Sequence, residues 1–238
     1  MKNNIFYPIK IIQLNAKAIP LSRGVADLII TDPPYAVMNK VNLYRGKKLK
    51  PITRSIDFDK MTLGEYSSLI KEVTKECYRI TRDGGTFICF GALELIHIVK
   101  KFGEEAGFLW RMPLYWKKTN PAPKIYLTTP QSSIEVAGFF TKGKKSTTFN
   151  ATNGGKVHNM SSHPLVHYTK RVHPTQKPYG LIEEWVKLFS NETDLIVDPL
   201  CGCGVLAEVC QLSNRNYFIG DLNPSYVINR NRNKILYR

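Results

Sequence analysis

Short apolar segments with the composition of β-strands alternate along this chain with segments that have the spacing of amphipathic helices. We expect strands over residues 10–14, 27–31, 86–90, 108–116, 134–141, 195–198 and 217–221. We expect helices over residues 62–80, 93–106, 178–190, 205–212 and 224–235. This alternation favours an α/β fold, doubly wound, with a mostly parallel sheet and helices on both faces. The strands 108–116 and 134–141 are expected to pair as an antiparallel hairpin, joined by the Pro-rich residues 120–131.

Composition limits the class of protein. The 238 residues are 43% hydrophobic and 22% charged, which is typical of a globular protein and excludes disordered, collagen-like and disulfide-scaffold chains. No apolar run approaches the ~20 residues of a membrane span, and Pro8 and Lys10 interrupt the N-terminal apolar segment. Five cysteines without CxxC spacing indicate a reducing cytosol, and neither a zinc site nor a disulfide framework. We therefore expect a soluble, cytoplasmic domain.

Positive charge is concentrated in two segments. The formal net charge is +15, from 34 Lys and Arg against 19 Asp and Glu. Residues 36–54 hold six basic side chains and no acidic one, and residues 110–180 hold eleven basic side chains and one acidic, Glu135. The rest of the chain is nearly neutral. This distribution favours a polyanion-binding surface over a surface charged only for solubility, because the same segments carry aromatic and turn residues.

The first motif that predicts chemistry is Asp32-Pro33-Pro34-Tyr35, which directly follows an apolar strand. Open α/β sheets place their ligands at the carboxyl ends of their strands, so this carboxylate is expected at a binding site. Two prolines fix the backbone, which leaves the Asp32 carboxylate and the Pro33 carbonyl as a rigid row of acceptors beside an aromatic ring. Such a row suits a planar group with an NH2, because two acceptors can take both amine hydrogens while Tyr35 stacks on the ring.

The second motif is a glycine-containing turn, Asp198-Pro199-Leu200-Cys201-Gly202-Cys203-Gly204, between a strand and a helix. Glycines at such a turn let a cofactor approach the backbone closely. Asp221 ends the next strand, 19 residues after Gly202, where a carboxylate can bind ribose hydroxyls. The same residues also fit a nicotinamide fingerprint. Two features argue against a dinucleotide: Asp198 would repel a pyrophosphate, and no second mononucleotide half follows, whereas a cationic sulfonium would tolerate that carboxylate.

The third motif is His173-Pro174-Thr175-Gln176-Lys177-Pro178, which leads into a helix. Alone it is an unremarkable helix start. The histidines at 158, 163, 167 and 173 have no Cys or acidic residue near them in the sequence, so we do not expect a metal site.

The order of the three motifs along the chain, with a basic segment between Asp-Pro-Pro-Tyr and HPTQKP, resembles the order found in one protein family. The order is Asp-Pro-Pro-Tyr, a basic variable segment, HPTQKP and an Asp-Pro-x-x-Gly-x-Gly loop. It is similar to that of the S-adenosyl-L-methionine-dependent DNA amino-methyltransferases of restriction–modification systems, which methylate an exocyclic amine. With the catalytic motif ahead of the cofactor motif, it resembles their β-class, circularly permuted form. The resemblance implies a Rossmann-like methyltransferase sheet and S-adenosyl-L-methionine as cofactor.

The resemblance assigns roles to individual residues. The catalytic motif is matched by Asp32, Pro33, Pro34 and Tyr35. The cofactor-binding positions are matched by Asn15, Ala16, Thr175, Gln176, Lys177, Asp198, Pro199, Cys201, Gly202, Gly204 and Asp221. The sequence departs from the family at Asn15, where an acid is usual, and at Cys203 and Val205, where Ser and Thr are usual; these changes bear on cofactor affinity.

DNA contacts are expected from the two basic segments. Residues 36–60 form a basic loop on the catalytic side, and residues 120–172 an inserted target-recognition region of a single domain spanning 1–238. The expected contacts are Lys40, Arg45, Lys47, Lys48, Lys50, Arg54, Lys117, Lys118, Asn120, Lys124, Lys142, Lys144, Lys145, Lys170 and Arg171.

The expected activity is methyl transfer from S-adenosyl-L-methionine to the N6 amine of adenine in double-stranded DNA, by base flipping and direct in-line transfer. Adenine is favoured over cytosine N4 because the family usually carries Asp at the first motif position for adenine and Ser for cytosine. The alternatives are cytosine N4 or RNA adenine methylation and, more remotely, an NAD(P)-dependent oxidoreductase or a silent DNA-binding module. The resemblance also implies, as candidate partners, a second copy of the chain and a cognate restriction endonuclease, in a bacterial or phage-infected cell.

Overall fold

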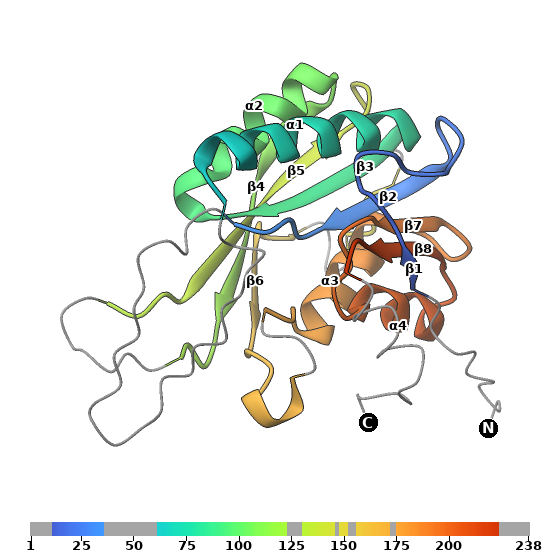
Figure 1. Ribbon diagram of the computed structural model, residues 1–238. Helices are drawn as coiled ribbons and strands as arrows, with labels where there is room; N and C mark the ends of the chain where they lie inside the picture. Colours follow the sequence, from blue (N-terminus) through green and yellow to red (C-terminus); the bar gives the residue numbers. More distant parts are fainter. Residues whose placement is uncertain are drawn as a thin grey trace, which may run out of the picture.

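A computed structural model describes residues 11–35, 61–122, 130–145, 148–151, 156–171 and 175–223 of the chain. Its described residues form an eight-stranded sheet in the order β1-β8-β7-β2-β3-β5-β4-β6, with helices on both faces (Figure 1). The strands are β1 (Ile12–Gln13), β2 (Ala26–Thr31), β3 (Thr81–Gly91), β4 (Leu109–Lys118), β5 (Ile134–Thr141), β6 (Met160–His163), β7 (Leu195–Asp198) and β8 (Asn216–Asp221). The helices are α1 (Leu63–Ile80), α2 (Ile96–Ala106), α3 (Tyr179–Phe189) and α4 (Val205–Leu212), with short 3-10 turns η3 (Leu93–Leu95) and η5 (Tyr168–Lys170).

The sheet is mostly parallel, as predicted. Only β5 runs against its neighbours, pairing antiparallel with both β3 and β4. The predicted hairpin of β4 and β5 is therefore present, and its register places Trp116 opposite Glu135. The other pairs of neighbouring strands are parallel: β1–β8, β8–β7, β7–β2, β2–β3 and β4–β6.

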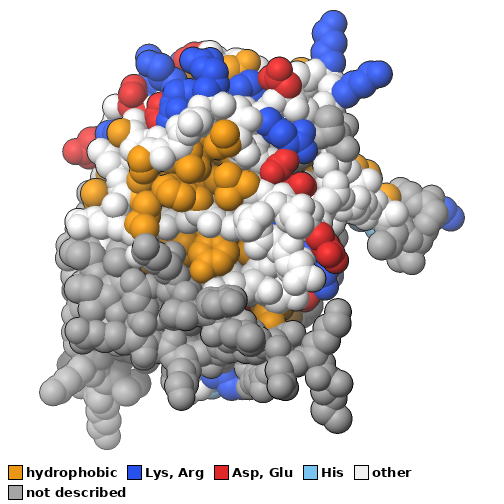
Figure 2. All heavy atoms as spheres, turned by 90° about the vertical axis from the view of Figure 1, so that its right-hand side faces the viewer, with side chains coloured by type: hydrophobic (Ala, Val, Ile, Leu, Met, Phe, Trp, Pro, Cys, Tyr) orange, Lys and Arg blue, Asp and Glu red, His pale blue; other side chains and the backbone are white. Residues whose placement is uncertain are grey.

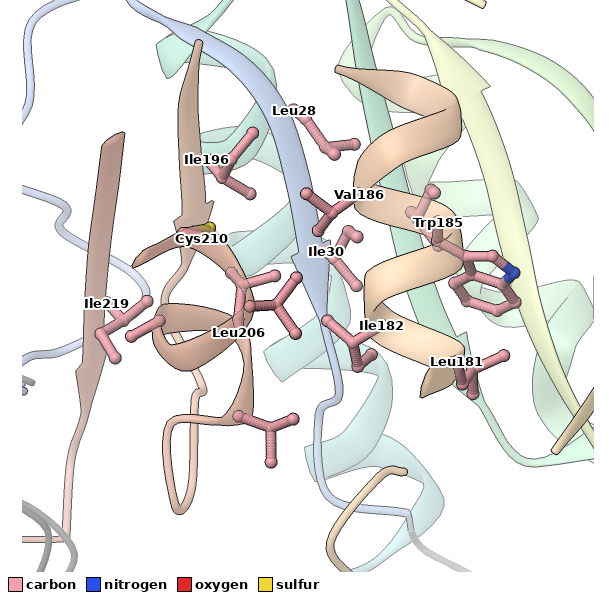
Figure 3. Packing of buried hydrophobic residues seen from close by; sticks show 14 of the residues in the cluster. Leu28, Ile30, Leu181, Ile182, Trp185, Val186, Ile196, Leu206, Cys210 and Ile219 are labelled. Atoms are coloured by element: carbon pink, nitrogen blue, oxygen red, sulfur yellow. The ribbon is translucent and has the colours of Figure 1, made fainter. Parts of the chain in front are cut away.

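Alternate residues of the central strand β2 face opposite helical layers. Leu28 and Ile30 pack with α3 and α4 in one core cluster, whereas Ile29 packs with α1 and α2 in the other. Figure 3 shows the first cluster, in which Trp185 and Leu206 from the two helices point at the strands. Full burial of each large apolar side chain contributes about 1.5–3 kcal/mol, so these two faces fix β2 in place.

Local signals set the helix ends. Thr62 and Glu65 form a complete capping box at the start of α1, and the buried side of that helix repeats every three or four residues. Gly107 ends α2 at φ +110°, where a Cβ atom would lie 2.8 Å from the Tyr78 ring, so only glycine fits.

Two expectations differ from the structure. The strand expected over residues 86–90 begins earlier, at Thr81, and the glycines before residue 86 form a bulge inside it: Gly84 has φ +76°, and the register with β2 shifts here. No strand was expected within residues 142–171, yet β6 lies there and adds to the sheet beside β4. The expected helix 224–235 lies outside the described residues. Among the described helices none is long and apolar enough to cross a membrane.

Candidate active site

A cavity of about 690 Å³ opens at the carboxyl ends of the parallel strands. Its walls include Asp32 after β2, Asp198 at the end of β7 and Asp221 at the end of β8. Strands β2 and β7 are neighbours, and the chain leaves them in opposite directions: β2 leads through α1 to β3, and β7 leads through α4 to β8. Ligands of open α/β sheets bind at such a topological switch point.

The cavity brings together most residues that the sequence assigned to the site. Those that line it are Asp32, Pro33, Pro34, Tyr35, Thr175, Gln176, Lys177, Asp198, Cys201, Gly202 and Asp221. Asn15, Ala16, Pro199 and Gly204 are not among the lining residues. The lining also includes residues that the sequence did not single out, among them Lys17, Glu65, Phe90 and Leu200.

Among the residues that line the cavity, the Asp32 carboxylate is held by two donors. The Tyr35 hydroxyl donates to Oδ1 at 2.6 Å, and the Lys177 ammonium donates to Oδ2 at 2.6 Å. Burial raises the pKa of Asp32, and the Lys177 charge opposes that rise. Burial and the neighbouring Asp32 also raise the pKa of Tyr35, so its hydroxyl is a donor at any physiological pH.

Lys177, a predicted cofactor-binding residue, lines the cavity, and its ammonium points to the Asp32 carboxylate. It is 8% exposed and also lies 3.1 Å from Oε2 of Glu135. Burial alone would lower the pKa of Lys177, but Asp32 and Glu135 together raise it. Glu135 in turn pairs with Lys118 at 2.9 Å. Burial would raise the pKa of Glu135, and the two ammonium groups hold it below its usual value.

Two other carboxylates of the cavity lining, Asp198 and Asp221, shape the glycine turn. Asp198 Oδ1 accepts from the Leu200 N–H at 3.1 Å, and burial raises the pKa of Asp198 to about 8. Asp221 Oδ2 accepts from the Gly202 N–H at 2.9 Å. Gly204 precedes α4 at φ +73°, and a Cβ there would lie 3.0 Å from Ile11. A buried acid that ionises near pH 8 favours a cationic ligand beside it.

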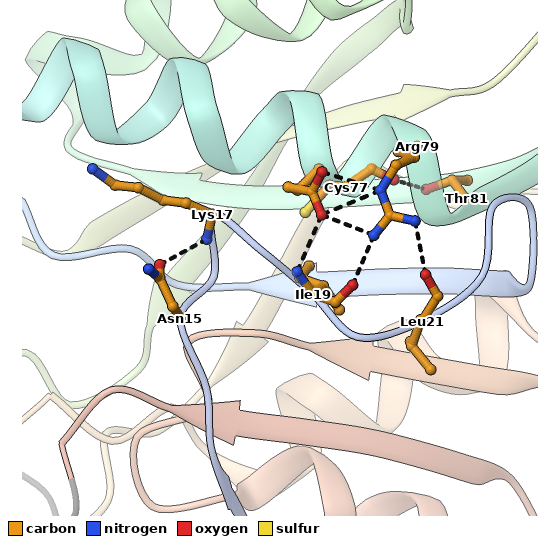
Figure 4. Close-up of polar contacts among 8 residues, drawn as sticks. Asn15, Lys17, Ile19, Leu21, Cys77, Arg79 and Thr81 are labelled. Atoms are coloured by element: carbon orange, nitrogen blue, oxygen red, sulfur yellow. Dashed lines mark hydrogen bonds and ion pairs between the residues drawn. The ribbon is translucent and has the colours of Figure 1, made fainter.

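The segment after β1 forms a further part of the site. Asn15 Oδ1 accepts from the Lys17 N–H at 3.0 Å, so its side chain turns the chain towards the cavity wall (Figure 4). Helix α1 holds the segment that follows. Glu76 accepts from the Ile19 N–H, and the Arg79 guanidinium donates to the carbonyls of Ile19 and Leu21.

Some residues predicted to bind DNA have other roles in the structure. Lys142 is buried and donates to the Tyr78 and Thr81 carbonyls at 3.0 and 2.8 Å, at the end of β5 away from the cavity, so it is a structural residue and not an exposed DNA contact. Lys144 and Lys145 follow Lys142 in the turn after β5, also away from the cavity. Lys118 is paired with Glu135.

The other predicted DNA contacts are more varied. Asn120 exchanges hydrogen bonds with the backbone of Leu165, and Arg171 donates to the Val166 carbonyl. Lys117 and Lys170 are exposed. Lys40, Arg45, Lys47, Lys48, Lys50, Arg54 and Lys124 lie outside the described residues. On the face drawn in Figure 2, basic side chains gather at the upper rim beside acidic ones. The described part of that face therefore carries charges of both signs and is not a uniformly positive surface.

Comparisons with known proteins agree with this architecture. Residues 26–229 match the N6/N4 family described as DNA methylase. The type II methyltransferase M.HpaI of Haemophilus parainfluenzae is 30% identical over 226 residues, covering 87% of this chain and 67% of its own. M.HinfI of Haemophilus influenzae is 26% identical, covering 84% of this chain and 60% of its own.

Solved structures share the fold. The M1.HpyAVI–SAM complex superposes with a TM-score of 0.68 at 22% identity, covering 87% of each chain. The cytosine-N4-specific PvuII DNA methyltransferase superposes with a TM-score of 0.70 at 15% identity, covering 90% of this chain and 82% of its own. The site and the fold define an α/β protein with one cavity at the topological switch point of its sheet. The chain belongs to the N6/N4 DNA methylase family.

Proposed function

We propose that this protein transfers a methyl group from S-adenosyl-L-methionine to the N6 amine of adenine in double-stranded DNA. One observation carries the proposal: the Asp32 carboxylate and the Tyr35 ring lie in the same cavity as the Asp198 and Asp221 carboxylates, which end the neighbouring strands β7 and β8. A methyl donor and an acceptor amine must meet in one cavity for direct transfer.

The residues at the Asp198 end fit the cofactor. Asp221 stands at the end of β8 with both carboxylate oxygens accepting backbone N–H groups, a position from which a carboxylate can bind ribose hydroxyls. The buried Asp198 supplies negative charge for the sulfonium. The positive φ values of Gly202 and Gly204 shape the turn for close approach of a ligand. When bound, S-adenosyl-L-methionine would supply an electrophilic methyl group.

The residues at the Asp32 end act on the amine. An exocyclic amine conjugated to a purine ring is a poor nucleophile because its lone pair is delocalised. Two acceptors, the Asp32 carboxylate and the Pro33 carbonyl, favour the pyramidal amine and stabilise the positive charge that develops on nitrogen. Both residues line the cavity. Tyr35 gives the flipped base a stacking partner, worth ~1–3 kcal/mol against the cost of unstacking.

Adenine is proposed over cytosine because of the Asp32-Pro33-Pro34-Tyr35 motif. The relatives named above are called type II methyltransferases, which supports a place in a restriction–modification system for this chain too. A homodimer, a cognate restriction endonuclease and a cytoplasmic location stay predictions, as do residues 36–60 and 120–172 as the DNA-contacting parts of a single domain.

The experiment compares the full-length protein with Asp32→Ala, and with Glu192→Ala as an exposed control. Unmethylated bacterial DNA is incubated with tritiated S-adenosyl-L-methionine, digested to nucleosides and separated. The wild-type protein and the control should label N6-methyladenine, and Asp32→Ala should bind the cofactor without transferring label. Label in N4-methylcytosine would assign the other base, and turnover by Asp32→Ala would contradict the mechanism.

A further inference from the structure

Two carboxylates and two ammonium groups form a continuous chain of charges beside the catalytic motif. Lys177 Nζ lies 2.6 Å from Asp32 Oδ2 and 3.1 Å from Glu135 Oε2, and Lys118 Nζ lies 2.9 Å from Glu135 Oε1. The four groups come from distant parts of the chain: the end of β2, the end of β4, the start of β5 and the residue two before α3. Lys177 is the member that touches both carboxylates.

The chain of charges keeps the Asp32 carboxylate ionised. A carboxylate that accepts hydrogen bonds from an amine must be ionised, yet burial raises the pKa of Asp32. A lone ammonium 2.6 Å away would keep Asp32 ionised, but would also draw its charge away from the amine. Glu135 divides the attraction of Lys177 between two carboxylates, and the chain of four is neutral when every member is charged.

We propose that Glu135 and Lys177 are positioning residues for methyl transfer. Glu135, itself held by Lys118, fixes Lys177 against Oδ2 of Asp32, so that the amine binds at Oδ1, the oxygen that also accepts from the Tyr35 hydroxyl. This inference rests on the proposed function, since it assigns the two residues a part in the same reaction. Neither residue makes or breaks a bond. Glu135 is not among the residues that line the cavity, and it forms ion pairs with the two lysines.

Other groups also face this chain of charges. Besides Lys177, the groups that shift the pKa of Asp32 are Tyr35 and Glu135. The Asp32 charge in turn raises the pKa values of Tyr66, Cys89 and Asp198. The Lys177 ammonium also lies over the rings of Phe90 and Tyr35, at 4.5 and 5.6 Å from their centroids. Among these only Lys177 neutralises Asp32 directly, so its removal should change the titration of Asp32 most.

The test uses Lys177→Met, Glu135→Gln and the double variant in the full-length protein, with the exposed pair Lys187→Met and Glu183→Gln on α3 as matched controls. Calorimetry with S-adenosyl-L-methionine and rates of tritium transfer to DNA from pH 5 to 9 are the readouts. Both single variants should keep the cofactor Kd within about twofold. We expect kcat at pH 7 to fall by up to about 100-fold, because the acceptor is misplaced.

The pH profile separates positioning from a structural role. The acidic limb of kcat should move to higher pH in Lys177→Met, because Asp32 loses its counter-ion, and to lower pH in Glu135→Gln, because a neighbouring negative charge is lost. The double variant should lie between the two. An acidic limb that stays in place in both single variants, with cofactor affinity intact, would overturn the inference.

A second readout needs no methyl transfer. The unfolding temperature of Lys177→Met should fall further below that of the wild type as pH rises from 5 to 8, because two buried carboxylates must then ionise without Lys177. A deficit that is the same at every pH would overturn the inference. If the wild-type protein transferred no label, the proposed function would fail while this measurement still decided whether Lys177 neutralises the two carboxylates.

Discussion

The hydroxyl of Tyr35 donates to Oδ1 of Asp32 at 2.6 Å. The residue whose ring is proposed to stack on the base is thus hydrogen-bonded, through its hydroxyl, to the carboxylate that is proposed to accept from the amine of the base. The Lys177 ammonium lies on Oδ2, the other oxygen of the same carboxylate. When the amine binds, the Tyr35 hydroxyl must therefore share or release Oδ1.

This relationship predicts different effects for two changes at Tyr35. Tyr35→Phe keeps the ring and frees Oδ1, so the KM for DNA should change little and the acidic limb of kcat should move to higher pH, because a donor to the carboxylate is lost. Tyr35→Ala also loses stacking worth ~1–3 kcal/mol, which is about 5- to 150-fold in binding. Steady-state kinetics on unmethylated DNA measure both. Equal KM values for the two variants would contradict stacking.

Asp198 should make both stability and cofactor binding depend on pH. Its pKa of about 8 in the folded chain lies above the ~3.9 of an unfolded Asp, so the folded state binds more protons between these values. Stability contributed by this group is therefore present at low pH and lost as pH rises towards 8. Asp198→Asn should raise the unfolding temperature at pH 8 more than at pH 5.

Cofactor affinity should rise with pH because of Asp198, whereas the stability that Asp198 contributes falls with pH. A bound sulfonium favours ionised Asp198, so the Kd for S-adenosyl-L-methionine should tighten as pH rises from about 6 to 8 and then level off. Calorimetry across that range measures it. Asp198→Asn should bind weakly at every pH, and a steep pH dependence that survived in this variant would assign the effect to another group.

The glycine at the start of α4 offers a matched pair of substitutions. Gly204 has φ +73° with Ile11 and Ile219 at 3.0 and 3.2 Å from a built Cβ, whereas Gly143 has φ +82° with nothing within 4 Å. Gly143→Ala should therefore cost only the backbone strain of about 1–2 kcal/mol. Gly204→Ala should cost more and also weaken cofactor binding. Thermal unfolding of the two variants compares them, and equal losses of stability would contradict a cost of crowding against Ile11 and Ile219.

The Arg79 guanidinium should support the cavity wall without touching a ligand. It donates to the Ile19 and Leu21 carbonyls at 2.7 Å each, and the same segment begins at Lys17 in the cavity wall. Arg79→Met should lower stability by ~1–3 kcal/mol through lost charged hydrogen bonds. It should also raise the cofactor Kd. Arg23→Met, at an exposed position nearby, is the control and should change neither quantity.

Two lysines that the sequence treats alike should behave differently. Lys117 is exposed on β4, and Lys142 is buried against the end of α1. Lys117→Met should weaken DNA binding and lower the slope of log K against log salt by about 1, without loss of stability. Lys142→Met should lower the unfolding temperature and leave the salt slope unchanged. Filter binding over a range of salt concentrations, with thermal unfolding alongside, distinguishes them.

Local patterns predicted most of the elements to within a few residues. Strands 134–141 and 195–198 and helix 205–212 were predicted at their observed bounds, because strong apolar periodicity and a glycine turn mark their ends. The strand β6 was missed because its four residues, Met160–His163, carry a single buried side chain and depend on pairing with β4. The glycines of β3 indicate a turn in isolation, and only the neighbouring strands make them a bulge.

Within the site, motifs located the carboxylates but not their partners. Asp32, Asp198 and Asp221 stand where their strands end, which the sequence shows directly. The Lys177–Glu135 contact depends on β5 lying between β3 and β4, an order that no local pattern contains. One signal was available: Glu135 is the single acidic residue of segment 110–180. An acid that interrupts a basic segment within a strand is a candidate for a buried ion pair.

The pairing of β2 with β7 has a consequence for synthesis on the ribosome. Leu28 and Ile29 of β2 pair with Ile196 and Val197, which emerge only after most of the chain has been made. Until then, one edge of the largely buried strand β2 has no partner, and exposed apolar edges of this kind invite association with other chains. Completion of this side of the sheet thus waits for the C-terminal strands, and slow translation before Leu195 should increase the burden on chaperones.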